Sequence, residues 1–319
     1  MSECGCFLGM DEAGYGPNLG PLLLTVTSWT TPCPPAEFNF YSELSSVVSS
    51  EGHDQGTKLH LADSKQVFVG KHGFASLERS ALALLSVAGA RVNSLHQLWN
   101  TLHGETVHPS ETLAPWYLDD MALPVAADPR QIEELSGRLA DCMQQIGLRL
   151  RSVRGDVVVE ERFNQLSLAE GSNKSQALSR LAFDLLKQVW QRHEPTVTLF
   201  VGDKHGGRNR YDEFLAAIVD HEFIHRLEEG PELSRYRVAR TELRFQVKGE
   251  QHLPVACASI VAKYLRELTM DQLNAFWKKH CPDLRPTRGY PLDARRFFQS
   301  VEPLSQQLGI ERARLWRER

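Results

Sequence analysis

The sequence predicts an α/β fold in which helices pack on a β-sheet, and three observations support this. Residues 196–201 are an apolar, β-branched run of the kind found in buried strands. Residues 172–193 carry apolar side chains at helical spacing and are followed by Pro195, which ends a helix. Strand and helix patterns alternate through the second half of the chain, which is typical of helices packed on a sheet.

The first elements surround a glycine-rich turn near the N-terminus. Residues 6–8 and 22–26 are apolar runs that predict two strands, and Gly14, Gly16 and Gly20 lie between them, where they allow a tight turn. Residues 32–50 are rich in Pro and Ser and predict a loop with at most a short helix. Residues 74–87 then show the spacing of a helix.

The middle of the chain has a different character. Residues 88–147 contain few periodic apolar positions, and we interpret them as an insertion, partly irregular, with one helix at 128–146. We expect residues 1–319 to form one α/β domain that includes this insertion and has a helical C-terminal part at 254–319. The remaining expected elements are strands at 148–153, 236–239 and 243–247 and helices at 212–224 and 254–276.

The bulk composition limits the classes of function. The chain has 319 residues, 42% of them hydrophobic, which suffices for a large buried core. Its net charge of -4 argues against a protein that coats nucleic acid nonspecifically, so any nucleic-acid binding must be local. Six cysteines show no zinc-site spacing, and no secretory or membrane-spanning run is apparent. We therefore expect a cytoplasmic, reduced protein that acts as a monomer away from membranes.

Four carboxylates stand out by their positions. Asp11 and Glu12 leave the first strand, and Asp203 lies where the buried strand 196–201 ends, a usual place for site residues in open α/β sheets. Glu267 lies on the helix that begins at Pro254. Hard divalent cations take oxygen ligands, and two of them can support an in-line displacement at a phosphodiester. The four carboxylates therefore predict a Mg²⁺ or Mn²⁺ site.

The helix after Pro254 has a polar stripe on an apolar background. Ser259, Lys263 and Glu267 are spaced i, i+4 and i+8, so they share one face. Residues 256–262 are otherwise small and apolar, so we expect the start of this helix to be packed and its polar stripe to face a cleft.

Five motifs resemble those of ribonuclease HII, the type 2 ribonuclease H family. In chain order they are GMDEAGYGPNLGP at 9–21, DSK at 63–65, the aspartate at 203, KGE at 248–250 with ACASIVAKYLRE at 256–267, and GY at 289–290. Any single motif is common by chance, but the order of all five is specific.

The resemblance implies a ribonuclease H-like fold, a mixed five-stranded sheet flanked by helices. It implies metal-dependent cleavage of the RNA strand, or of embedded ribonucleotides, in RNA–DNA duplexes, leaving a 3′-hydroxyl and a 5′-phosphate. The implied metal ligands and catalytic residues are Asp11, Glu12, Asp203 and Glu267. The implied substrate-binding residues are Gly14, Tyr15 and Gly16 at the ribose 2′-hydroxyl, Lys65 and Lys263 at phosphates, and Tyr290 at the adjoining sugar.

The sequence also departs from the family pattern. Tyr15 stands where the family has Arg between the two turn glycines, and Glu267 stands where it usually has Asp. Residues 202–210 (GDKHGGRNR) are unusually basic, which fits either a plain turn or a phosphate-binding loop. Two alternatives therefore stay open: a nuclease of the same fold with another nucleic-acid substrate, and a non-catalytic nucleic-acid-binding protein. A phosphatase is disfavoured, because residues 11–13 lack the Asp-x-Asp motif that it would need.

Overall fold

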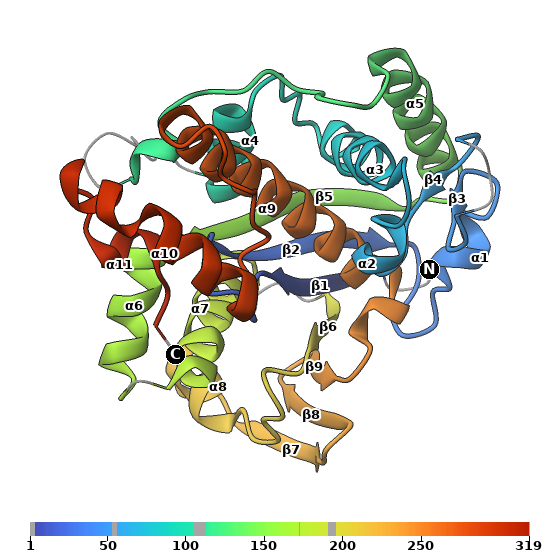
Figure 1. Ribbon diagram of the computed structural model, residues 1–319. Coiled ribbons are helices and arrows are strands. Elements are labelled where there is room, and N and C mark those ends of the chain that lie inside the picture. The colour runs from blue at the N-terminus through green and yellow to red at the C-terminus, as the bar shows by residue number, and fades with distance from the viewer. Residues whose placement is uncertain (1–3, 53–55, 105–112, 172, 191–195, 319) are drawn as a thin grey trace.

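The computed structural model describes residues 4–52, 56–104, 113–171, 173–190 and 196–318, and it is an α/β protein (Figure 1). A seven-stranded mixed sheet lies at its centre, with strand order β5-β2-β1-β6-β9-β8-β7. The strands are β1 (Gly5–Ala13), β2 (Leu22–Thr31), β5 (Arg149–Val158), β6 (Val197–Asp203), β7 (Ile224–Glu229), β8 (Leu233–Val238) and β9 (Thr241–Gln246). A small parallel pair, β3 (Val48–Ser49) with β4 (Leu59–His60), stands apart from it.

The pairing within the sheet changes direction at its centre. β5, β2 and β1 are antiparallel to one another, whereas β1, β6 and β9 run parallel. These five strands match the expected mixed sheet. The sheet is larger than expected, because β8 and β7 continue it antiparallel beyond β9. β7 was missed because the exposed sequence IHRLEE of this edge strand does not alternate between apolar and polar.

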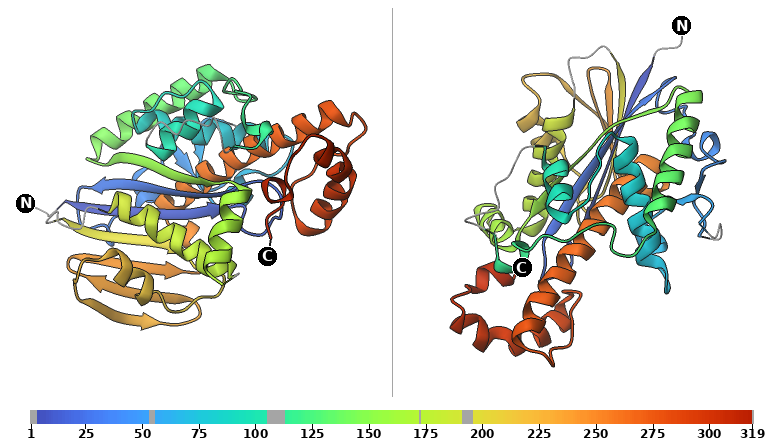
Figure 2. Two further views of the ribbon diagram at one scale, coloured as in Figure 1. Left: turned by 90° about the vertical axis from the view of Figure 1, so that its left-hand side faces the viewer. Right: turned by 90° about the horizontal axis from the view of Figure 1, so that it is seen from above.

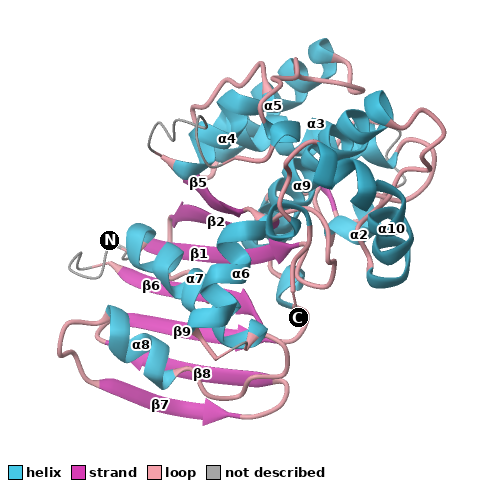
Figure 3. Cartoon of the chain, turned by 60° about the vertical axis from the view of Figure 1, so that its left-hand side comes forward, coloured by secondary structure: helices cyan, strands magenta, loops and turns pink. Residues whose placement is uncertain are grey.

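Helices cover both faces of the sheet (Figures 2 and 3). On one face α9 (Leu253–His280) packs across β1 and β2, with α3 (Gly73–Val87) and α5 (Pro129–Gln145) outside it. On the other face lie α6 (Glu160–Ala169), α7 (Lys174–Val189) and α8 (Asp212–Ile218). The remaining helical segments are α1 (Phe40–Glu43), α2 (Ser64–Val67), α4 (Leu95–His103), η1 (Pro115–Tyr117), η2 (Gly249–Gln251), α10 (Pro291–Gln307) and α11 (Arg312–Leu315).

The alternation of side chains along each strand divides the core into two clusters. Phe7 and Leu199 belong to the cluster under α9, whereas their chain neighbours Leu8 and Phe200 belong to the cluster under α7. Successive side chains of a strand point to opposite faces, so each strand contributes to both layers. The predicted class, a mixed sheet flanked by helices with a helical C-terminal part, is confirmed.

α9 approaches β1 closely because Gly9 has no side chain. A Cβ atom at this position would lie 2.4 Å from the carbonyl carbon of Pro254, in the first turn of α9. Thr27 on β2 also donates a 2.7 Å hydrogen bond to the Pro254 carbonyl oxygen. These contacts fix the height of α9 above the strand that carries Asp11.

The segment 88–147 packs on the α9 face, so its described part belongs to the main core. Trp116 of η1 contacts the Trp277 ring of α9, with ring centroids 6.0 Å apart. The Glu78 carboxylate of α3 is fully buried and accepts hydrogen bonds from the backbone N–H groups of residues 125–127 and from the Tyr264 hydroxyl. That the segment is an insertion stays a prediction.

Several expected boundaries differ from the observed ones. The helix at 172–193 is observed as α7 over Lys174–Val189, and its expected end at 191–193 lies outside the described residues. The helix at 212–224 ends early at Ile218, since the chain then turns into β7. α6 was missed because β5 runs five residues beyond its expected end and leads directly into it. No helix in the described ranges is both long and apolar enough to traverse a lipid bilayer.

Candidate active site

Two of the four predicted carboxylates lie side by side at the centre of the sheet. β1 and β6 are parallel, with Met10 opposite Gly202, so Asp11 and Asp203 follow at the same level of adjacent strands. Phe7 and Leu199 point toward α9, and Asp11 and Asp203 have the same parity along their strands. The two carboxylates therefore face the α9 side together.

The N-terminal half of α9 supplies the polar surroundings of Asp11. A hydrogen bond from the Ser259 hydroxyl favours the ionised form of Asp11, as does one from the Glu12 amide at 2.8 Å. The hydroxyls of Ser259 and Ser64 are 2.9 Å apart, which joins α9 to the first residue of α2. The expected cleft-facing stripe on α9 thus begins at Ser259.

Glu12 comes from the same strand but, by alternation, projects toward the opposite face. The charge of Glu12 raises the pKa values of Tyr15 and Tyr211, which belong to the α7 side. The charges of Asp11 and Asp203 in turn raise the pKa of Glu12. The acidic pair is therefore split across the end of β1, with one carboxylate on each side of the strand.

Two further carboxylates, Asp63 and Glu250, contribute to the electrostatics of this group, and the sequence had indicated no role for either. In addition to burial, the charge of Asp203 raises the pKa of Glu250, and the charges of Asp203 and Glu250 both raise the pKa of Asp11. The charge of Asp63 raises the pKa values of Asp203 and Glu250. Lys65 is the cation that opposes this repulsion at Glu12, Asp203 and Glu250. Lys65 was expected at a phosphate, and the structure places it next to the acidic side chains.

The acidic side chains share a shift in one direction. Burial is the main cause, and it raises the pKa of Asp11 to about 7 and also raises the pKa values of Glu12, Asp203 and Glu250. Mutual repulsion adds to burial at each of them. A cluster of carboxylates that resists ionisation is typical of a site that accepts a cation or a proton.

Glu267 lies elsewhere on α9. It is eight residues beyond Ser259, which places its backbone about 12 Å farther along the helix axis. Its buried carboxylate pairs with Lys263 at 2.5 Å, with Arg266 at 3.8 Å and with Arg288. In this structure Glu267 therefore holds three cations, and its assignment as a metal ligand stays a prediction.

Lys263 is drawn into the same ion-pair group. Its ammonium lies 5.0 Å from the centroid of the Phe68 ring, and the Arg288 guanidinium lies 5.5 Å from the same centroid. Burial lowers the pKa of Lys263 to about 8, with Arg266 and Arg288 contributing and Tyr290 opposing the change. Lys263 and Arg288 thus form a cationic edge beside Tyr290.

Gly16 and Tyr290, two of the residues expected at the sugar, lie close to each other. A Cβ atom on Gly16 would lie 4.0 Å from the Tyr290 ring, and Tyr290 is 55% exposed. Gly289 holds Tyr290 there, because its carbonyl accepts a 2.8 Å hydrogen bond from the Asn18 amide. Gly14 has a φ of 93°, the left-handed region that favours glycine. The turn and Tyr290 therefore share one surface.

The glycine turn is braced from below by Arg317. This buried guanidinium donates to the carbonyl oxygens of Gly14 and Pro17, and its own carbonyl accepts a 2.9 Å hydrogen bond from the Asn18 side chain. Burial lowers the pKa of Arg317 to about 10, and Arg266 adds to the shift while Glu160 opposes it. No sequence motif pointed to this residue.

Tyr15 leaves the turn toward the α7 face. The ammonium of Lys174, the first residue of α7, lies 4.7 Å from its ring centroid. Tyr15 is half-buried, and its pKa is raised by burial and by Glu12. A cation therefore stands next to the residue that occupies the position of the family's Arg.

Most of the cations in residues 202–210 make hydrogen bonds that stabilise the conformation of this loop. The Lys204 ammonium is only 8% exposed and donates to Arg208 O, Asn209 Oδ1, Gly230 O and Ser234 Oγ. Arg208 donates to the side chains of Gln176 and Glu213. Arg210 is the exposed cation of this stretch and lies 3.6 Å from Glu229. The plain-turn reading therefore fits Lys204 and Arg208.

The cluster suits a hard divalent cation by chemistry, though its side chains are not arranged as a ready ligand set. Within the described ranges, no three Asp, Glu, His or Cys side chains converge closely enough to hold a metal ion. The charged groups that raise the pKa of Asp11 are nevertheless carboxylates, Asp203 and Glu250, and carboxylates are the ligands that Mg²⁺ and Mn²⁺ prefer. Burial is the main reason that the pKa values of Asp11, Asp203 and Glu250 are raised, and repulsion between carboxylates adds to it.

Comparisons with known proteins give structural likenesses at low sequence identity. No family model and no curated protein matches the chain. Ribonuclease HII of Archaeoglobus fulgidus, in its complex with PCNA, is 15% identical, with 98% of this chain and 94% of that chain covered and a TM-score of 0.41. Ribonuclease H2 of Pyrococcus horikoshii is 15% identical (97% and 92% covered, TM-score 0.42), and ribonuclease H3 of Aquifex aeolicus is 14% identical (97% and 70%, TM-score 0.37). Because these scores lie below 0.5, the case for function rests on the site itself.

Proposed function

We propose that this protein is a metal-dependent endonuclease that cuts the RNA strand or embedded ribonucleotides of RNA–DNA duplexes. The observation that carries the proposal is the pair Asp11 and Asp203, side by side at the carboxyl ends of parallel strands. The glycine turn that follows Asp11 along the chain packs against the exposed Tyr290. An acidic site beside a bare-backbone turn suits hydrolysis of a phosphodiester next to a ribose 2′-hydroxyl.

Each group would have a distinct task in the reaction. Asp11 and Asp203, with Glu12 and Glu250 near them, would hold Mg²⁺ or Mn²⁺, which when bound would lower the pKa of the attacking water and stabilise the leaving oxygen. The backbone at Gly14, Tyr15 and Gly16 would contact the 2′-hydroxyl. Tyr290 would pack on the adjoining sugar, and the cations Lys65 and Lys263 would position phosphates. The products would carry a 3′-hydroxyl and a 5′-phosphate.

One assay tests the activity. A duplex with a single ribonucleotide is incubated with Mg²⁺ or Mn²⁺ and with wild type, Asp11→Asn, or Glu37→Gln, which removes an exposed acid in the loop before α1. We expect cutting at the ribonucleotide by wild type and Glu37→Gln, and a loss of at least about a hundredfold in Asp11→Asn. Equal cutting of an all-DNA duplex would instead favour a nuclease with another substrate. Tight binding with no cutting in either metal would favour the non-catalytic alternative.

A second comparison assigns the remaining carboxylates. Glu250→Gln and Glu267→Gln are assayed over a range of Mn²⁺ concentrations. If Glu267 is a ligand, its variant needs more metal for half-maximal cutting, and the folded protein stays as stable as wild type. If Glu267 serves its three cations, its variant loses stability and the metal requirement is unchanged, whereas Glu250→Gln raises that requirement.

The Tyr15 position has its own test. Because Tyr cannot form the bidentate phosphate contact of a guanidinium, Tyr15→Arg should raise the preference for a ribonucleotide over an all-DNA duplex. The preference is measured as the ratio of kcat/KM values for the two duplexes. An unchanged or lower ratio would show that Lys174 or another group already performs the role of the family's Arg.

A further inference from the structure

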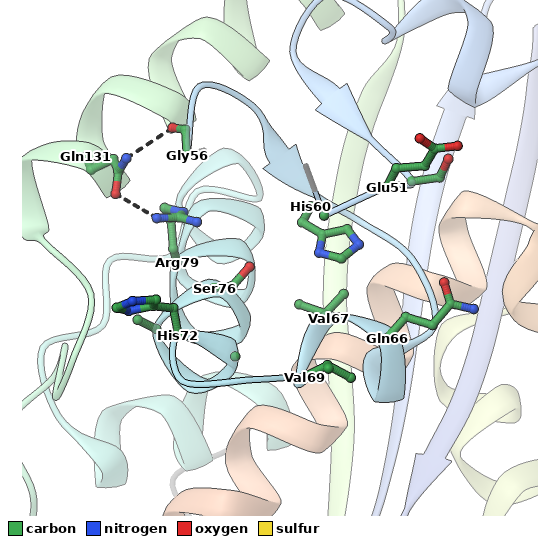
Figure 4. Close-up of a pocket in the computed structure, with 14 residues that line it drawn as sticks. Glu51, Gly56, His60, Gln66, Val67, Val69, His72, Ser76, Arg79 and Gln131 are labelled. Carbon is green, nitrogen blue, oxygen red and sulfur yellow. Dashed lines mark hydrogen bonds between the residues drawn. The ribbon is translucent and has the colours of Figure 1, made fainter. Parts of the chain in front are cut away.

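A cavity of about 730 Å³ lies beside α2 and α3 (Figure 4). Its walls come from α2 and the loop after it, from one face of α3, from Gln131 of α5, and from Gly52 and Gly56. This volume lies within the range of small-molecule sites. The proposed function makes no use of the cavity.

Arg79 is the cation of this cavity, and it is held in place. Its Nη1 donates a 2.7 Å hydrogen bond to Gln131 Oε1, and Gln131 Nε2 donates a 3.0 Å hydrogen bond to the Gly56 carbonyl oxygen (Figure 4). A guanidinium held in this way at the wall of a cavity suits a bound oxyanion.

The α3 surface around Arg79 adds further donors. His72, Ser76 and Arg79 are spaced i, i+4 and i+7 and all line the cavity, so they share one face of the helix. The Ser76 hydroxyl lies in the first turn, and no side chain caps the N-terminus of this 15-residue helix. The helix dipole adds positive potential beside the guanidinium.

The opposite wall has a different character. Val67, Val69 and Ala75 supply apolar surface, and His60 supplies an aromatic ring. The Glu51 carboxylate is drawn on the far side of His60 from Arg79 (Figure 4). A glycine is required at residue 56, where φ is 84° and a Cβ atom would lie 2.5 Å from the Gln131 side chain. The cavity thus joins an anion-binding end to an apolar end, as a nucleotide requires.

We infer that this cavity binds a phosphate group carried on a nucleoside, with Arg79 as the phosphate-binding side chain. Where the ligand is the substrate strand, the inference rests on the proposed function. Lys65 and Gln66 are neighbours in α2, and they face the acidic cluster and the cavity respectively. A strand that leaves the acidic site past Lys65 therefore reaches the cavity across a single helical turn. The same chemistry would serve a free nucleotide, and the experiment separates the two sources.

The test measures binding without divalent cation, so that no cutting occurs. Fluorescence anisotropy is recorded for a short duplex with one ribonucleotide and for a longer duplex with flanks on both sides, and calorimetry is used with adenosine 5′-monophosphate. The variants are Arg79→Met, Val69→Trp and Arg130→Met. Val69 is 70% exposed at the cavity wall, so its replacement obstructs the cavity without disturbing the core. Arg130 is exposed and adjacent to Gln131 but does not line the cavity, so it controls for loss of charge.

If the substrate strand is the source, Arg79→Met and Val69→Trp weaken binding of the longer duplex about tenfold, whereas binding of the short duplex stays unchanged. Arg79→Met also lowers the slope of log K against log salt by about one, which Arg130→Met does not. If a free nucleotide is the source, only adenosine monophosphate binding is lost. Unchanged binding of both ligands in Arg79→Met and Val69→Trp, or equal loss in Arg130→Met, would overturn the inference.

The proposed function and this inference can fail separately. A wild-type protein that cuts no ribonucleotide duplex, yet loses nucleotide or duplex binding in Arg79→Met, would refute the nuclease and leave the phosphate site standing. Normal cutting with binding unchanged in Arg79→Met would do the reverse. Thermal melting of each variant shows whether it is folded. If Arg79→Met is not folded, the binding measured with Val69→Trp decides the inference.

Discussion

The buried Glu78 carboxylate should be the group that holds residues 125–127 onto α3. Its Oε2 accepts hydrogen bonds from the amides of Ala126 at 2.6 Å and Ala127 at 2.7 Å. Its Oε1 accepts from the Val125 amide at 2.7 Å and from the Tyr264 hydroxyl at 2.8 Å. Glu78→Gln keeps the shape of the side chain but turns one acceptor oxygen into an NH₂ donor.

The magnitude follows from these contacts. With the amide oxygen at the Oε1 position, the NH₂ group faces the two N–H donors of residues 126 and 127, so two hydrogen bonds are lost. Hydrogen bonds to a charged group contribute about 1.5–3 kcal/mol each, so Glu78→Gln should lower the free energy of unfolding by about 3–6 kcal/mol. That is a large part of the roughly 5–15 kcal/mol that stabilises a typical domain.

Urea unfolding followed by circular dichroism measures the change. Glu134→Gln, on the exposed side of α5, is the matched control and should change stability by less than about 0.5 kcal/mol. A loss below about 1 kcal/mol in Glu78→Gln, or a loss equal to that of the control, would refute the clamp. Hydrogen exchange at residues 125–127 shows whether the loss is global or confined to that segment.

Three other predictions test the fold and the site. Burial raises the pKa of Glu160 from its ordinary 4.5 to about 7, so its contribution to stability is present below pH 4.5 and is lost as pH rises through 7. Wild type should therefore lose up to about 3 kcal/mol relative to Glu160→Gln between pH 5 and pH 8, and parallel urea curves would contradict this. Gly9→Ala should cost about 2–3 kcal/mol through the clash with Pro254, whereas Gly137→Ala in α5, where a Cβ atom meets open space, should be neutral or stabilising in the same urea assay. Lys204→Met should lower the free energy of unfolding by about 2–3 kcal/mol and leave the salt dependence of duplex binding unchanged, whereas Arg210→Met should lower the slope of log K against log salt by about one. A lower salt slope in Lys204→Met with no loss of stability would instead indicate that Lys204 binds phosphate.

The strongly periodic parts of the fold were predictable from the sequence. α7 and β6 have a clear stripe and a clear apolar run, and Pro254 marks the start of α9 to within one residue. The weakly patterned parts were not. β7 is an edge strand whose side chains are mostly exposed, so burial leaves no alternation in its sequence to detect.

The site shows the same limit. Asp11 and Asp203 could be placed together, because the ends of neighbouring parallel strands meet at one edge. Glu250 could not, because it lies in η2, between β9 and α9, where no periodicity fixes the direction of a side chain. The partners of Glu267 were hidden for another reason: Arg288 comes from a loop 21 residues away, and helical spacing indicates only Lys263.

The contact between Arg317 and the glycine turn has a consequence for how the protein matures. The turn and its brace are separated by 300 residues, so a ribosome must make almost everything in between before the carbonyls of Gly14 and Pro17 gain their partner. A nascent chain that already contains β1, β6 and α9 would hold Asp11 and Asp203 in register but would have a loose turn. The glycine turn would therefore take its final conformation late in synthesis, after the acidic pair is in place.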